Sequence, residues 1–218
     1  MIPPDLTLST RRAILPRMTD LREQVLSASL ALIEQEGVGA LSLREVARRA
    51  GVSHQAPYHH FGHKEAIVAE LVTRGYLRLA ERLEEAERGR GTPSRRLLRA
   101  GLAYVDFALS EPASFRLMFR PELVDRERFA ASGEAGERAY SVLVRLVAER
   151  HGDGRAAGLG SEAQRNLDAL VTMHWSMVHG LATLLLDGSL CRRFATRRER
   201  DSHVARTMEL FMEATGRS

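Results

Sequence analysis

The chain has 218 residues, of which 44% are hydrophobic, and a formal net charge of +4. This is enough apolar material for one large domain, or for a small domain joined to a larger one, and the basic balance permits a polyanionic partner without requiring one. The single cysteine, Cys191, excludes an intrachain disulfide and a zinc site built on cysteines. The N-terminal residues lack an apolar core of signal-peptide length, so we expect a cytoplasmic protein without a membrane partner.

Residues 1–18 are rich in proline and arginine. This composition predicts a flexible basic arm. Two interpretations stay open for it: a disordered tail without a role, or an arm that reaches the phosphates or the minor groove of a nucleic acid.

The first clear helix is expected to begin at Thr19 or Asp20 and to end before Gly37. Two short helical patterns follow, separated by the break Ala50-Gly51-Val52-Ser53. Ser42 and Glu45 have the spacing of a capping box at the start of the first pattern. We expect Ser53 to cap the second pattern, His54–His60. Two short helices around a turn that contains glycine predict a helix-turn-helix, whose second helix fits the DNA major groove.

A long amphipathic helix is predicted next, from Phe61 to about Glu87, before a break that contains Gly89, Gly91 and Pro93. Its length makes it the natural lever between the two parts of the chain. The predicted organisation is an arm at residues 1–18, a helix-turn-helix domain at residues 19–65 and a larger helical domain at residues 66–218.

The larger domain shows only helical patterns, so the predicted fold class is all-α. Helices are expected after Thr92-Pro93, after Ser110-Glu111-Pro112, from about Glu134 to His151, from Glu162 to Leu186, and at the C-terminus. The segment Glu162–Leu186 is apolar on nearly all sides, and such a helix must be covered on several sides. We therefore expect part of its surface to meet a second subunit.

The helix-turn-helix segment closely resembles the DNA-binding domain of the TetR-type transcriptional repressors. The matching residues are Leu41-Ser42-Leu43-Arg44-Glu45-Val46-Ala47, Ala50-Gly51-Val52-Ser53, Tyr58-His59-His60-Phe61 and Lys64-Glu65. A second segment, Ser110 to Phe119, and the run Trp175-Ser176-Met177-Val178-His179-Gly180 are similar to the subgroup whose C-terminal domain is named for Trp, His and Gly.

The resemblance implies an all-α homodimer of about nine helices per chain, with a three-helix bundle and a larger ligand-binding and dimerisation domain. It also implies a repressor that binds a palindromic operator in double-stranded DNA and leaves it when a small apolar or amphipathic effector enters the C-terminal domain. Two residues depart from the family pattern: Pro57, where an aliphatic residue is usual, and Gln55, where Gly or Ala is usual. We expect Pro57 near the end of the first turn of the recognition helix, where it removes about one hydrogen bond.

DNA recognition needs side chains that hold phosphates and others that read base edges. We expect six residues to contact phosphates: Ser42, Arg44, Ser53, Tyr58, His60 and Lys64. The expected base readers are His54, Gln55 and His59, because Gln pairs with adenine and His can donate to guanine. Ala56 or Pro57 is expected to touch a thymine methyl. The serines could act as helix caps alone, and Tyr58 could be partly core.

The histidines around residue 60 also raise the question of a metal site. His59 and His63 are four residues apart, a spacing that places two imidazoles on one face of a continuous helix. The Gly62 junction is expected to separate their helices, and no acidic or cysteine ligand accompanies them. We therefore expect neither a metal nor a cofactor.

An effector pocket is expected among the aromatic and methionine residues of the larger domain, with ordinary core as the alternative for each. The candidates are Tyr104, Phe107, Phe115, Met118, Phe119, Met173, His174, Trp175 and Met177. Two other classes of function compare poorly or equally with the sequence. An enzyme finds no support, because no nucleophile–base spacing or phosphate loop is present. A constitutive DNA-binding or adaptor protein without an effector stays open.

Overall fold

The computed structural model describes residues 18–125, 127–152 and 161–216, so the N-terminal arm at residues 1–17 lies outside the described residues. Within these ranges the chain forms nine α-helices and three short 3₁₀ helices, with no strand. The all-α prediction is confirmed.

The N-terminal part is a group of three helices. They are α1 (Met18–Glu36), α2 (Leu43–Ala50) and α3 (Ala56–Phe61), with the 3₁₀ helix η1 (Val38–Ala40) between the first two. Val25, Leu32 and Val46 are fully buried at its centre. Val25 and Leu32 come from α1 and Val46 comes from α2, so the buried sides of these two helices pack together.

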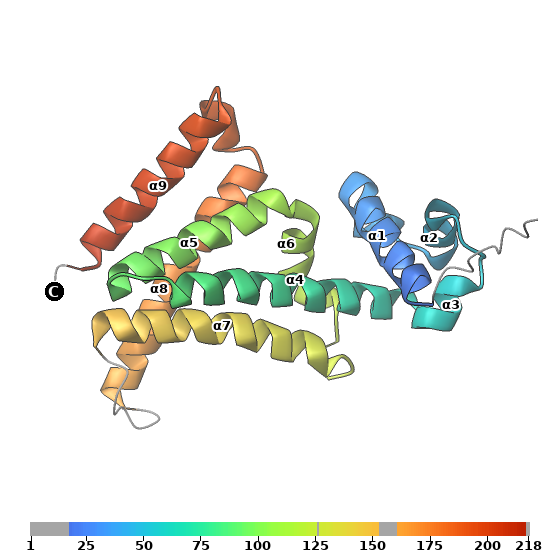
Figure 1. The fold of residues 1–218 in the computed structure, drawn as a ribbon, viewed down its shortest axis with the longest axis horizontal. Helices are drawn as coiled ribbons and strands as arrows, with labels where there is room; N and C mark the ends of the chain where they lie inside the picture. Colours follow the sequence, from blue (N-terminus) through green and yellow to red (C-terminus); the bar gives the residue numbers. More distant parts are fainter. Residues whose placement is uncertain (1–17, 126, 153–160, 217–218) are drawn as a thin grey trace, which may run out of the picture.

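The long helix α4 (Lys64–Arg88) connects this group to the rest of the chain. Around it lie α5 (Pro93–Ser110), α6 (Pro112–Met118), the 3₁₀ helix η2 (Pro121–Leu123) and α7 (Ala130–His151). Figure 1 shows α4 running lengthwise between α5 and α7, with α1–α3 at one of its ends. Its most extensive packing is against α7 and then α5.

One row of buried residues along α4 has members every four residues: Ile67, Leu71, Gly75, Leu79 and Leu83. At Gly75 the neighbouring helix α6 comes so close that an added Cβ would lie 2.6 Å from the sulfur of Met118. Real Cβ atoms do not approach that closely, so a side chain at residue 75 would force the flexible Met118 side chain to shift. The row therefore holds α4 tightly on α6 at its middle.

The C-terminal part consists of α8 (Glu162–Leu186), the 3₁₀ helix η3 (Cys191–Arg193) and α9 (Arg197–Ala214). The predicted bounds of α8 are confirmed, whereas α7 begins four residues before the predicted Glu134. The early start was missed because Ala130 and Ala131 are exposed and Gly133 is a poor helix former, so they add no apolar periodicity. The capping prediction for α5 is confirmed, since the Thr92 hydroxyl accepts from the Arg95 amide at 3.3 Å.

Helix α8 is long and apolar enough to cross a membrane, as judged by length and composition only. The core helix of a soluble protein passes the same test. Only 33% of its most apolar 18-residue window is buried within the single chain. Much of an apolar helix is therefore left uncovered, and the absence of a membrane partner stays a prediction.

Ion pairs fasten α4 to its neighbours at both ends. Near the three-helix group, Arg74 pairs with Glu23 of α1 at 2.6 Å and Arg22 pairs with Glu70 at 3.1 Å. At the other end, Glu84 and Glu87 pair with Arg138 and Arg145 of α7, both at 2.7 Å. Such exposed pairs each contribute little to stability, so the buried row rather than the charges holds the helix.

Candidate DNA-binding surface and ligand cavity

The helix-turn-helix begins with a capped helix, as predicted. The Ser42 hydroxyl accepts from the backbone amide of Glu45 at 3.2 Å, and Gly51 ends α2 with a φ of 66°. A positive φ of this size is the left-handed conformation that glycine adopts without strain. The sequence therefore determines both ends of α2.

The start of the recognition helix differs from the prediction. Helix α3 begins at Ala56 rather than His54, and Ser53 does not cap it: the residue at the cap is Gln55, without a side-chain hydrogen bond. The cause is Pro57, which lies in the first turn, where backbone amides have no helical partner, so its missing N–H removes no helical hydrogen bond. Pro57 is also fully buried, which excludes it from contact with a thymine methyl in this conformation.

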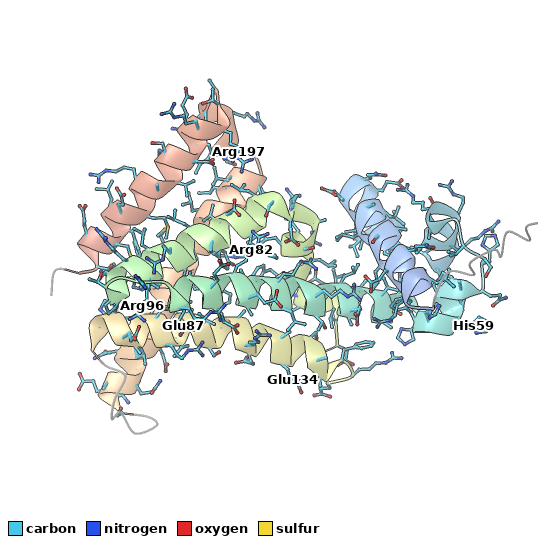
Figure 2. The ribbon with its side chains drawn as sticks, viewed as in Figure 1. His59, Arg82, Glu87, Arg96, Glu134 and Arg197 are labelled. Atoms are coloured by element: carbon cyan, nitrogen blue, oxygen red, sulfur yellow. The ribbon has the colours of Figure 1, made fainter. Side chains whose placement is uncertain are left out.

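The predicted DNA-contacting side chains lie at the surface of one end of the molecule. Figure 2 shows His59 at the tip of α3, away from the body of the larger domain. Tyr58 is 52% exposed, so it is a surface residue rather than partly core. His60 is half-buried against Phe61. The remaining predicted contacts are all exposed: Ser42, Arg44, Ser53, His54, Gln55, His59 and Lys64.

The cations of α2 and of the start of α4 are divided between paired and unpaired side chains. Arg48 and Arg49 both pair with Glu45, and Arg49 also pairs with Glu36 of α1. These guanidinium groups lower the pKa of Glu45 to about 2. Among the described residues, no hydrogen bond or ion pair involves the side chains of Arg44 or Lys64. Arg44 and Lys64 are therefore the cations left available to phosphates here.

The histidines near residue 60 are divided by a helix boundary. Gly62 ends α3 with a φ of 73°, so His59 and His63 belong to different helices, as predicted. In the described part of the chain, no three potential metal-ligating side chains come together. His63 instead caps α4: its Nδ1 lies 3.2 Å from the Ala66 amide, and its Nε2 lies 2.7 Å from Arg128 in the segment before α7. A neutral imidazole has one bare nitrogen, so it can accept from only one of these two donors at a time.

A cavity of about 350 Å³ lies in the larger domain. It is bounded by α4, α5, α7, α8 and α9 together with the end of α6, and its walls are mostly apolar. The lining residues are Tyr76, Leu79, Leu83, Leu97, Ala100, Gly101, Tyr104, Phe119, Gly133, Gly136, Glu137, Ala139, Tyr140, Val142, Leu143, Leu146, Thr172, His174, Trp175, Met177, Val178, Met208, Phe211 and Met212.

Five of the nine predicted pocket residues line this cavity. They are Tyr104, Phe119, His174, Trp175 and Met177. The other four do not line it: Phe107, Phe115 and Met118 are buried in the core, and Met173 is 41% exposed. The prediction selected residues by type, but the position of a residue on its helix determines whether it lines the cavity. Met173 and Met177 are four apart on α8, yet only Met177 lies on the lining.

The sequence prediction missed the walls contributed by α4 and α7. Tyr76, Leu79 and Leu83 of α4 line the cavity, as do Gly133 and Gly136 of α7. The α4 residues belong to its regular apolar side, which signals burial without signalling a void. Gly133 and Gly136 were the sequence signal that could have indicated the cavity, because a helical residue without a side chain leaves space beside the helix.

A small hydrogen-bonded group lies in the wall between α5 and α8. The Trp175 indole N–H donates to the Tyr104 hydroxyl oxygen at 3.4 Å, and this hydroxyl lies 2.8 Å from Nδ1 of His179. Burial raises the pKa of Tyr104 and lowers the pKa of His179. Both changes favour the neutral forms. The His179 ring is enclosed by Phe115 and Phe119, with ring centroids at 5.4 and 4.6 Å.

His174 is a second buried polar group on α8. Its Nδ1 lies 2.8 Å from the carbonyl oxygen of Leu170 and so carries the proton, and burial lowers its pKa. Its Nε2 is buried without a hydrogen-bond partner. Leaving a buried acceptor without a hydrogen bond costs free energy. The Nε2 of His174 is therefore a second hydrogen-bond acceptor in a largely apolar region.

Two family models match the chain. The model described as "Bacterial regulatory proteins, tetR family" matches residues 25–71, and the model described as "Tetracyclin repressor-like, C-terminal domain" matches residues 97–212. The first covers the helix-turn-helix, and the second covers most of the domain that holds the cavity.

Similar proteins include two bacterial regulators. The HTH-type transcriptional regulator YobS of Bacillus subtilis is 31% identical over 100 residues, 46% of this chain and 52% of that protein. The HTH-type transcriptional activator FasR of Mycolicibacterium smegmatis is 31% identical over 131 residues, 60% of this chain and 59% of that protein. The chain thus spans about half the length of the curated relatives that it matches.

Solved structures match over nearly the whole chain. A Rhodococcus sp. RHA1 protein of unknown function has a TM-score of 0.71 and 29% identity, with 94% of this chain and 98% of that chain covered. The regulator PfmR of Thermus thermophilus has a TM-score of 0.65 and 19% identity, with 87% and 97% covered. At that identity PfmR supports the fold alone.

Proposed function

Because the chain belongs to the TetR family of bacterial transcriptional regulators, we propose that it is a homodimeric repressor that a small apolar or amphipathic ligand releases from a palindromic operator. The family consists of DNA-binding regulators rather than enzymes. The observation that carries the proposal is α4, because this helix begins directly after the helix-turn-helix and its far half lines the cavity. Membership of the Trp-His-Gly subgroup stays a prediction.

The proposed DNA contacts follow from exposure and chemistry. Ser42, Arg44, Ser53, Tyr58, His60 and Lys64 would hold phosphates through hydroxyl, imidazole and cationic groups. His54, Gln55 and His59 would read bases. His54 and Gln55 precede α3, so they would enter the groove from the turn that leads into the helix.

A second copy of the chain would cover the exposed apolar side of α8 and α9. Met173, Leu184 and Leu210 are 41%, 47% and 49% exposed. An added Cβ at Gly180 would meet no described atom within 4 Å, so the close neighbour that a glycine in a helix suggests is not found within the chain. Exposed apolar surface of this kind marks interfaces, and a symmetric dimer places two reading heads on a palindromic site.

The route from ligand to DNA would be a change in the tilt of α4. Tyr76, Leu79 and Leu83 face the cavity, whereas His63 at the N-terminus of the helix contacts Arg128 just before α7. A ligand between α4 and α7 would favour one packing of these helices over another. Half-sites lie about 34–36 Å apart in DNA, so the two heads tolerate little change in separation. The ligand can shift the balance only by its different affinity for the two packings.

We further propose that the protein acts in the bacterial cytoplasm, where the DNA is, and without a metal or cofactor. A constitutive DNA-binding or adaptor protein without an effector is less well supported, because such a protein does not need a cavity of about 350 Å³ beside α4. An activator is the other outcome to test, since FasR is a named activator.

The test combines three measurements on the full chain. An operator is selected from random duplexes, its symmetry and the stoichiometry of the complex are determined, and transcription from a promoter that carries it is measured with and without the protein. We expect a palindromic site, a dimer or a pair of dimers, and reduced transcription. A monomer bound to an asymmetric site would contradict the dimer, and increased transcription would contradict the repressor.

A further inference from the structure

We propose that the cavity selects an uncharged ligand that carries one hydrogen-bond-donating group, such as a hydroxyl, with this group at Tyr104 and the apolar body along α4 and α7. This inference deepens the proposed function and rests on it only in treating the cavity ligand as the effector. It names the chemical class of the ligand and the residue that recognises its polar end.

The residues that line the cavity carry almost no charge. Among the 24 lining residues, Glu137 is the only one with a charged side chain, and it is exposed. Elsewhere the chain is rich in arginine, yet within residues 18–125, 127–152 and 161–216 neither arginine nor lysine lines the cavity. A buried carboxylate or phosphate would therefore lose its hydration without gaining a cation, which is strongly unfavourable. Anionic ligands such as fatty acids are disfavoured for this reason.

A cationic ligand is disfavoured by the position of Glu137. This carboxylate comes from an exposed position on α7, so a cation that pairs with it must stay near solvent. The buried polar groups in the walls are neutral. Burial raises the pKa of Tyr104 and lowers the pKa of His174, so neither supplies a counter-charge to a buried ligand.

The hydrogen bonds at Tyr104 determine the polarity of the recognised group. The indole of Trp175 is a donor only, so the Tyr104 oxygen accepts from it. We assign to neutral His179 the tautomer with the proton on Nε2, and in this tautomer the Tyr104 hydroxyl donates to the bare Nδ1 at 2.8 Å. One lone pair of the Tyr104 oxygen is left, and it accepts a hydrogen bond. Because Tyr104 and Trp175 both line the cavity, this acceptor lies in its wall.

The size of the cavity sets the scale of the ligand. Its 350 Å³ lies at the small end of the range for small-molecule sites. At roughly 30 Å³ per non-hydrogen atom, the share of a water molecule in the liquid, it holds about a dozen such atoms. A ten-carbon chain with one polar end matches this size.

The protein contains a single tryptophan, Trp175, and this residue lines the cavity. Its fluorescence therefore reports ligand binding directly, without DNA. The experiment titrates the full-length protein with 1-decanol, decanoate and decylammonium at about pH 7.5, where the acid and the amine are ionised. We expect 1-decanol to bind at least about tenfold more tightly than either ion, a difference of about 1.4 kcal/mol.

The role of Tyr104 is tested by substitution. The wild-type protein is expected to prefer 1-decanol over decyl methyl ether, which cannot donate a hydrogen bond, by about fivefold or more, and Tyr104→Phe is expected to abolish this preference. Tyr140→Phe is the matched control, because Tyr140 lines the cavity at an exposed position and should keep the preference. Circular dichroism checks that both variants fold.

The outcomes separate this inference from the proposed function. Decanoate or decylammonium binding as tightly as 1-decanol would overturn the inference, as would the absence of any fluorescence response up to about 1 mM ligand, the weak limit of useful affinity. If Tyr104→Phe does not fold, the comparison of the three ligands on the wild-type protein still tests whether the cavity prefers an uncharged ligand. If 1-decanol binds as expected but leaves operator binding unchanged, the inference about the cavity stands and the proposed effector function fails.

Discussion

In its N-terminal half, α4 buries Ile67 and Leu71 among the helices α1 and α3 that pack on it, whereas in its C-terminal half Leu79 and Leu83 face a cavity of about 350 Å³. Both pairs belong to the same row, repeat with the same spacing, and are shielded from water. The N-terminal half of α4 is packed against a filled core, and its C-terminal half borders the cavity. The difference shows that helical periodicity determines which side of a helix is covered, but not how completely its neighbours fill the space.

The two halves also place their polar groups differently. At the DNA-binding end, polar side chains such as Arg44 and His59 are exposed, with no described hydrogen bond to the rest of the chain. At the cavity, Tyr104 and His174 are buried and hydrogen-bonded. Exposed polar side chains are suited to contact DNA, whose phosphates release bound counterions when cations replace them. Buried polar side chains are suited to bind a small neutral ligand.

The largest expected effect compares one core residue from each half. Ile67→Ala removes a fully buried side chain from a closed core and should cost about 2–5 kcal/mol in the free energy of unfolding. Leu83→Ala should fall at or below about 2 kcal/mol, because this side chain already lacks contacts on its cavity side. Urea unfolding measures both. Equal costs would contradict the distinction between a closed and a hollow half.

The proposed DNA-binding surface is tested at one proposed base reader and one proposed phosphate contact. His59→Ala should weaken binding to the selected operator by about 1–3 kcal/mol while changing non-specific binding little. Lys64→Ala should weaken binding to all duplexes alike and reduce the salt dependence by about one counterion. Fluorescence anisotropy over a range of salt concentrations measures both. If His59→Ala weakened all sequences equally, its role as a base reader would be wrong.

A smaller effect separates the two serines of the helix-turn-helix. Ser42→Ala removes a helix cap and should cost about 1 kcal/mol of stability. Ser53→Ala is the matched control: this exposed side chain does not cap α3, so its stability should change by less than about 0.5 kcal/mol. Both variants should weaken DNA binding if both hydroxyls contact phosphates. A Ser53→Ala variant as unstable as Ser42→Ala would contradict the observed start of α3.

The smallest expected effect is on pH dependence. Burial lowers the pKa of His174 and His179 in the folded protein, so the unfolded chain binds more protons. The free energy of unfolding should therefore be at its full value above about pH 6.5 and should fall as the pH drops through the folded-state pKa values. Urea unfolding between about pH 5 and 7.5 measures this, and His179→Gln should reduce the slope. A free energy of unfolding that stays constant in the wild-type protein as the pH falls would contradict the neutral, buried state of these histidines.

Much of the fold follows from local sequence signals. Caps at Ser42 and Thr92, the glycine at Gly51, and the apolar pattern of Glu162–Leu186 predict the helices that contain them. The start of α3 could not be predicted from Ser53, because a buried proline two residues into the helix determines it instead.

The cavity was less predictable than the helices. Residue type correctly indicated Tyr104 and Trp175 but also selected Phe107, which lies in the filled core. The contribution of α4 was missed because Leu79 and Leu83 look the same in sequence as Ile67 and Leu71. Whether an apolar side chain faces a neighbour or a void depends on the packing of several helices, and that information is not local.

We propose above all that α4 couples the cavity to the DNA-binding surface. The most direct measurement is the affinity of a cavity ligand, from Trp175 fluorescence, with the protein free and with it saturated by the selected operator. Coupling is reciprocal, so the operator should weaken ligand binding by the factor by which the ligand weakens operator binding, about fivefold or more for a coupling of at least about 1 kcal/mol. An unrelated duplex should have no such effect. Equal ligand affinity with and without the operator would contradict the claim.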